Sequence, residues 1–110
     1  MSADSCILFY GLPFELSGED VEACELRKDP RMQAARNAGL HHYWGAFGID
    51  LEQYVLFVGL LLGTFGPEHQ MEGQYLPASL QAAFQETDKK LKTAGFQGDA
   101  KLFIRYRLDQ

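Results

Sequence analysis

The segment Tyr54–Phe65 contains no charged residue and is apolar on both faces that an extended chain presents. Successive side chains of a strand point to opposite sides of the sheet. One face holds Tyr54, Leu56, Val58, Leu60 and Leu62, and the other holds Val55, Phe57, Leu61 and Phe65. A strand that is apolar on both faces is typical of the centre of a sheet. The segment therefore predicts a central strand, in which Gly59 and Gly63 admit a close neighbour.

Start and stop patterns for helices lie on both sides of this segment. Ser17 and Asp20 have the spacing of an N-cap and its N3 partner, and Asp29-Pro30 combines a capping residue with a proline suited to N1. Together with the apolar and alternating runs, these patterns predict the following elements in order. They are a strand at Cys6–Tyr10 closed by Gly11 and Pro13, a helix after Ser17, a helix from Asp29 to Ala38 with Gly39 after its end, an aromatic strand at His41–Gly48 with a hairpin loop near Ile49-Asp50, the central strand Tyr54–Phe65, a polar loop at Gly66–Tyr75, a helix at Pro77–Ala94 closed by Gly95, and an edge strand at Lys101–Leu108.

The order β-α-β-β-α-β is that of a ferredoxin-like, two-layer α+β sandwich. We expect a single domain over residues 1–110, with a four-stranded antiparallel sheet and the helices on one of its faces. The other face of Tyr54–Phe65 would then remain open although its side chains are apolar, and an open apolar face marks an interface. The sequence thus predicts a homodimer that packs sheet face to sheet face, or a small apolar ligand on that face.

Composition excludes several classes of partner. Ten basic residues against fifteen acidic ones give a net charge of −5, whereas binders of nucleic acid or anionic membranes need a basic surface. The most apolar stretch is shorter than the roughly 20 residues that span a bilayer. Cys6 and Cys24 have no metal-binding or disulfide spacing, so we expect two reduced thiols in a cytoplasmic protein.

Candidate chemistry concentrates in the middle of the chain. The stretch from Asn37 to Asp88 contains every histidine and the tryptophan but no lysine or arginine, so a phosphate site there would lack its usual cation. Neither a metal motif nor a cofactor motif is present, and we predict no metal and no cofactor. The favoured function is a non-catalytic binding or interaction domain. The alternative is a small enzyme, by fold analogy alone with dimeric α/β barrels of the monooxygenase type. Its pocket between subunits would be lined by His41, His42, Tyr43, Trp44, Glu68, His69 and Glu72.

Basic residues alternate along the last predicted strand. Lys101, Arg105 and Arg107 share one face with Phe103. Charge runs are usually solvated surfaces, but these three are also sufficient for a basic patch that meets an acidic partner or ligand. The sequence leaves both interpretations open.

Overall fold

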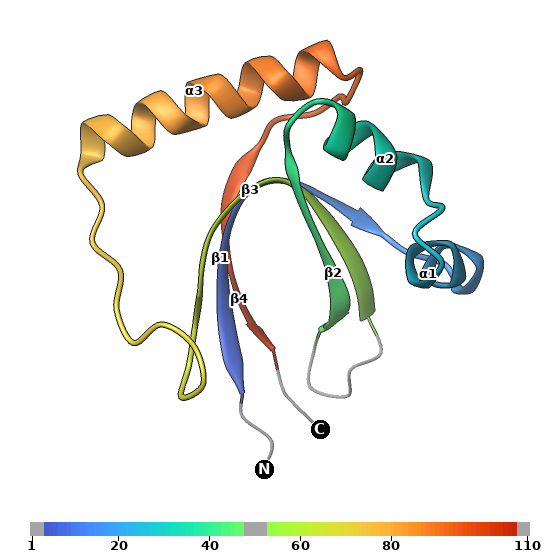
Figure 1. Cartoon of the computed structure of the whole chain (residues 1–110), viewed down its shortest axis with the longest axis horizontal. Helices are drawn as coiled ribbons and strands as arrows, with labels where there is room; N and C mark the ends of the chain where they lie inside the picture. The colour runs from blue at the N-terminus through green and yellow to red at the C-terminus, as the bar shows by residue number, and fades with distance from the viewer. Residues whose placement is uncertain (1–3, 48–52, 108–110) are drawn as a thin grey trace.

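The computed structural model describes residues 4–47 and 53–107. Within them the chain is an α+β structure with a four-stranded antiparallel sheet and three helices (Figure 1). In chain order the elements are β1 (Ser5–Glu15), α1 (Gly18–Glu25), α2 (Pro30–Asn37), β2 (His41–Phe47), β3 (Gln53–Phe65), α3 (Pro77–Thr93) and β4 (Lys101–Arg107).

The strands lie in the order β2-β3-β1-β4, and every neighbouring pair is antiparallel. The predictions that the third strand is central and that the last strand is an edge are therefore confirmed. The helices are placed differently from the predicted layer. In Figure 1, α3 lies across the crest of the sheet instead of along the strands, and α1 and α2 stand beside the end of β1.

The sheet is bent into an arch, and the bend occurs where β1 and β3 each carry a glycine. Gly11 and Gly59 are paired in register. β4 pairs with β1 only as far as Gly11, and β2 pairs with β3 only as far as Gly59. One limb of the arch therefore carries β2 and the other carries β4, and β3 arches over the crest between them (Figure 1). A Cβ on Gly11 would overlap the Val58 carbonyl oxygen, and one on Gly59 would overlap that of Tyr10.

The first strand does not end at Gly11 and Pro13, as the sequence predicted, but continues to Glu15. Leu16 N–H donates to the Tyr54 carbonyl, and backbone N–H groups alternate sides along a strand, so position 13 faces away from β3. On that side the pairing with β4 has already ended at Gly11. A proline without an N–H is tolerated there because no partner strand requires the bond.

Two apolar clusters fill the two faces of the arch. The outer cluster lies between the sheet and the helices, and its buried members are Leu12, Cys24, Met32, Ala35, Leu40, Leu56, Val58 and Leu91. The inner cluster lies within the arch, and its buried members are Ile7, Phe9, Phe47, Val55 and Phe57. The expectation that the face of Tyr54–Phe65 away from the helices stays open is thus wrong, because that face carries Val55 and Phe57 and both are buried. The bend brings β2 and β4 toward each other, and side chains of the chain itself cover that face.

A β-bulge also changes the predicted faces of the third strand. The register between β1 and β3 shifts after Leu8, which pairs with Gly63 while Phe9 pairs with Leu61. Leu62 is the extra residue, so alternation reverses beyond it. Phe65, predicted to share a face with Phe57, pairs with Cys6 and lies on the outer face instead.

The predicted helix boundaries are confirmed by their hydrogen bonds. Ser17 and Asp20 form a reciprocal capping box, and Asp29 caps α2 ahead of Pro30. Gly39 and Gly95 have the positive φ of residues that close a helix. The hairpin loop predicted near Ile49-Asp50 lies outside the described residues. None of the described helices combines the length and the apolar character needed to cross a membrane.

Replacing Gly59 by alanine tests the arch. The added Cβ meets backbone atoms of Tyr10 and Gly11, which cannot move aside as a flexible side chain can, and Gly59 has a φ of +154°. We expect Gly59→Ala to lower the free energy of unfolding by roughly 2–4 kcal/mol, measured by chemical denaturation. Gly18→Ala is the control because no atom lies within 4 Å of its Cβ position. A G59A variant as stable as G18A would contradict the bend.

Candidate functional site

The edge strand β4 exposes its aliphatic face and buries part of its basic face. Leu102, Ile104 and Tyr106 are 46%, 70% and 58% exposed. Phe103, Arg105 and Arg107 alternate with them and are half-buried against the inside of the arch. This is the reverse of the usual edge strand, whose solvent face is polar. Both faces of β4 are therefore candidates for a functional surface.

The outer face forms what we call the β4 apolar patch, made of Leu8, Leu102, Ile104 and Tyr106. Leu8 is half-buried and pairs directly with Ile104 across the two strands. The Tyr106 hydroxyl donates a hydrogen bond to Asp4 at 2.6 Å at the rim, and this bond raises the pKa of Tyr106. The four patch residues are uncharged, so the patch has the character of a hydrophobic contact surface.

The inner face holds two guanidinium groups over aromatic rings. The Arg105 guanidinium carbon lies 5.8 Å from the ring centres of both Phe47 and Phe57. That of Arg107 lies 5.8 Å from the ring centre of Tyr43. Arg107 Nη1 also donates to the Tyr43 hydroxyl at 2.7 Å. These contacts join β4 to β2 and β3 across the arch and fix both arginines by cation–π attraction.

The histidines and aromatic residues of β2 divide between the two faces of the sheet. His41 and Tyr43 share the inner-face alternation, and the His41 Nδ1 accepts a hydrogen bond from Leu61 N–H at 3.0 Å. His42 and Trp44 have the opposite alternation, and Trp44 packs against the outer cluster. Burial, assisted by the charge of Arg36, lowers the pKa of His42.

The remaining predicted pocket residues lie on the exposed segment between β3 and α3. Glu68, His69 and Glu72 are all exposed. His69 lines a shallow hollow with residues 61–64 and Gln70, whereas His41 and His42 line another, and the two hollows share Leu61. In the described part of the chain, no group of three His, Cys, Asp or Glu side chains is placed to hold a metal ion. Sequence reasoning did not foresee that Tyr43 would pair with Arg107.

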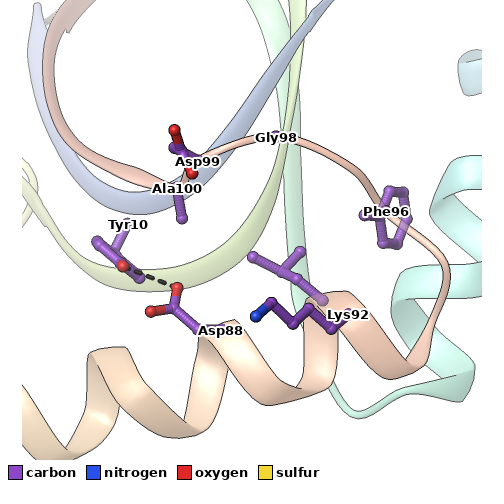
Figure 2. A pocket seen from close by; sticks show the side chains of 8 residues that line it. Tyr10, Asp88, Lys92, Phe96, Gly98, Asp99 and Ala100 are labelled. Atoms are coloured by element: carbon purple, nitrogen blue, oxygen red, sulfur yellow. Dashed lines mark hydrogen bonds between the residues drawn. The ribbon is translucent and has the colours of Figure 1, made fainter.

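A further pocket, of about 210 Å³, lies between β1, α3 and the segment leading into β4. Figure 2 shows Tyr10 and Asp88 pointing toward one another in it. The Tyr10 hydroxyl donates to Asp88 Oδ1 at 2.8 Å, and its ring stacks on Phe84 with centres 4.0 Å apart. Burial, together with this bond to Asp88, raises the pKa of Tyr10 to about 12. The phenol thus stays protonated at neutral pH. Its hydrogen bond to Asp88 and its stacking on Phe84 attach α3 to the sheet.

The Tyr10–Asp88 bond predicts how stability depends on alkaline pH. The pKa of Tyr10 is raised from the ordinary 10.0 to about 12 in the folded protein. Its contribution to the free energy of unfolding is therefore fully present below the ordinary pKa and is lost as the pH rises to the folded-state pKa. We expect Tyr10→Phe to cost about 1 kcal/mol at neutral pH and less as Tyr10 ionises. Denaturation of both proteins across this pH window measures the difference. In Asp88→Asn, ultraviolet titration should show the pKa of Tyr10 falling; an unchanged value would contradict the bond.

The chain matches no protein family model, no curated protein and no solved structure. Its function therefore has to follow from its own residues. Two surfaces stand out, and both belong to β4: the outer apolar patch and the inner pair of arginines. The Tyr10–Asp88 pocket has a structural explanation in the attachment of α3.

Proposed function

We propose that the chain is a homodimeric interaction domain whose two copies pack through the β4 apolar patch. The observation that carries this proposal is the exposure of three large side chains in alternate positions of one strand, with Ile104 70% exposed at the centre. Full burial of an exposed Leu or Ile side chain contributes roughly 1.5–3 kcal/mol, and each of these three would gain the part that corresponds to its exposed surface. A surface of this kind on a small domain is typical of a protein interface.

A second copy of the chain is the occupant that the composition of the patch favours. The net charge of −5 on each copy opposes association in general. The four residues of the β4 apolar patch are uncharged, so the contact itself adds no like-charge repulsion and offers no charge that would select an oppositely charged partner. A two-fold axis near Ile104 would set Leu102 of each copy against Tyr106 of the other, which is the self-complementary arrangement of symmetric dimers.

We also infer that the fold is a modified ferredoxin-like arrangement. The strand order and the antiparallel pairs support it. The departure is in the helices, because α1 and α2 replace one crossover helix with two short ones separated at Asp29-Pro30.

The free thiols of Cys6 and Cys24 support a reducing compartment, for which we propose the cytoplasm.

The enzyme alternative receives less support. Its seven pocket residues divide between both faces of β2 and the exposed segment before α3. Within the described residues, Tyr43 is occupied by Arg107 and His41 by a backbone N–H. A catalytic set needs its acid, base and substrate-binding groups within hydrogen-bond reach of one site. We therefore favour interaction over catalysis.

Replacing Ile104 by glutamate tests the proposed dimer. The side chain is exposed in a single copy, so folding tolerates the change, whereas two glutamates at a two-fold interface would bring like charges into an apolar contact. We expect Ile104→Glu to weaken dimerisation at least about a hundredfold (~2.7 kcal/mol), measured by sedimentation velocity over a range of concentrations.

Leu26→Glu is the matched control. Leu26 is 57% exposed and directly follows α1, a helix that Figure 1 shows apart from β4. The L26E variant should therefore leave the dimer intact. A wild-type protein that sediments as a monomer at high micromolar concentration would overturn the proposal. Equal weakening by I104E and L26E would overturn the location of the interface.

A further inference from the structure

The two arginines on the inner face of β4 have more N–H donors than the described residues accept from. Within the described residues the two side chains make one hydrogen bond, from Arg107 Nη1 to the Tyr43 hydroxyl. Each guanidinium group has five N–H donors. Among residues 4–47 and 53–107, neither Arg105 nor Arg107 has a carboxylate within ion-pair distance. We infer that Arg105 and Arg107 form a binding site for a small dianionic oxyanion, such as a phosphate group or a dicarboxylate.

The aromatic rings hold the guanidinium groups ready for such a ligand. Arg105 lies over Phe47 and Phe57, and Arg107 lies over Tyr43. Contact with a ring face leaves the N–H groups at the edge of the guanidinium plane able to donate. Both side chains are half-buried, so they have lost part of their hydration and part of their rotamer freedom before a ligand arrives. Preorganisation of this kind reduces the entropic cost of binding.

The surrounding strands do not compete for these charges. Glu15 is the one acidic residue in the four described strands, and it makes no ion pair with either arginine. Six of the other described basic side chains are exposed and form no ion pair, whereas the two that are half-buried do pair with acids: Arg31 binds Asp29 at 2.9 Å, and Lys90 lies 3.6 Å from Glu86. Arg105 and Arg107 are the half-buried basic side chains that form no ion pair among the described residues, and an anionic ligand would explain this difference.

The spacing of the arginines sets the class of ligand. Residues two apart on a strand have Cα atoms about 6.6–6.8 Å apart and project to the same side. A single oxyanion with two charges, or two carboxylates on a short linker, can be held between such groups, and guanidinium matches both geometries bidentately. This inference does not depend on the proposed dimer because the dimer would use the opposite face of β4.

Calorimetric titration with inorganic phosphate and, separately, with succinate tests the site. We expect binding of at least one probe that Arg105→Gln and Arg107→Gln each weaken tenfold or more. Lys101→Gln removes the same charge from the exposed start of the same strand and should change affinity by less than twofold. Comparing the two probes distinguishes a phosphate site from a dicarboxylate site.

Arg105→Lys and Arg107→Lys separate geometry from charge. Lysine keeps the positive charge but loses the planar fork, so affinity should still fall several-fold. Thermal unfolding of each variant shows whether it has folded. The inference is overturned if neither phosphate nor succinate binds at millimolar concentration. Equal weakening by Lys101→Gln would also overturn it, because general attraction would then suffice.

Discussion

The close approach of two backbones at Gly11 and Gly59 is the constraint on which the rest of the structure depends. Any side chain at either position would overlap a carbonyl of the opposite strand. Because both central strands bend together, the sheet becomes an arch whose limbs carry different edge strands (Figure 1). Bends of this kind at glycines are the means by which sheets curve strongly enough to close upon themselves.

The bend decides which apolar residues are covered. Within the arch, Phe9, Phe47 and Phe57 bury one another, so the inner face needs no second layer of helices or second chain. On the outer face, α3 crosses the crest (Figure 1). Its Phe84 stacks on Tyr10, and its Leu91 belongs to the same cluster as Leu12, but the outer side of β4 stays exposed. A flat sheet with two helices along its strands would have the opposite distribution, with the exposed apolar face on the side away from the helices.

Local patterns predicted the parts of the fold that depend on local physics. The caps at Ser17 and Asp29 and the closing glycines are set by residues within one turn of each helix, and the structure has them all. The central position of Tyr54–Phe65 also followed from its own composition. The bend did not, because it depends on pairing Gly11 with Gly59, and a single sequence does not fix that register. The face of Phe65 was wrong for the same reason: a bulge at Leu62 reverses the alternation.

The sequence predicted the two rows of side chains on β4 but not which of them is exposed. Alternation correctly separated the aliphatic row of β4 from its basic row, but it does not state which row faces solvent. Charged rows normally do, and here the reverse holds because the aromatic interior of the arch offers ring faces to Arg105 and Arg107. The histidines and acidic residues predicted a pocket formed by the middle of the chain. The hydrogen-bond partner of the Tyr43 hydroxyl is instead Arg107, which is far away in sequence.

The unusual orientation of β4, with its apolar row exposed and its arginines half-buried, underlies both the proposed dimer and the proposed anion site. Neither proposal depends on the other. A guanidinium group is the cation best suited to partial burial, since it is weakly hydrated and stacks on aromatic rings. Placing two of them inside the arch leaves Leu102, Ile104 and Tyr106 no alternative but the outer face, since strand side chains alternate. The proposed hydrophobic contact surface and the proposed anion site therefore both follow from burying the arginine side of β4.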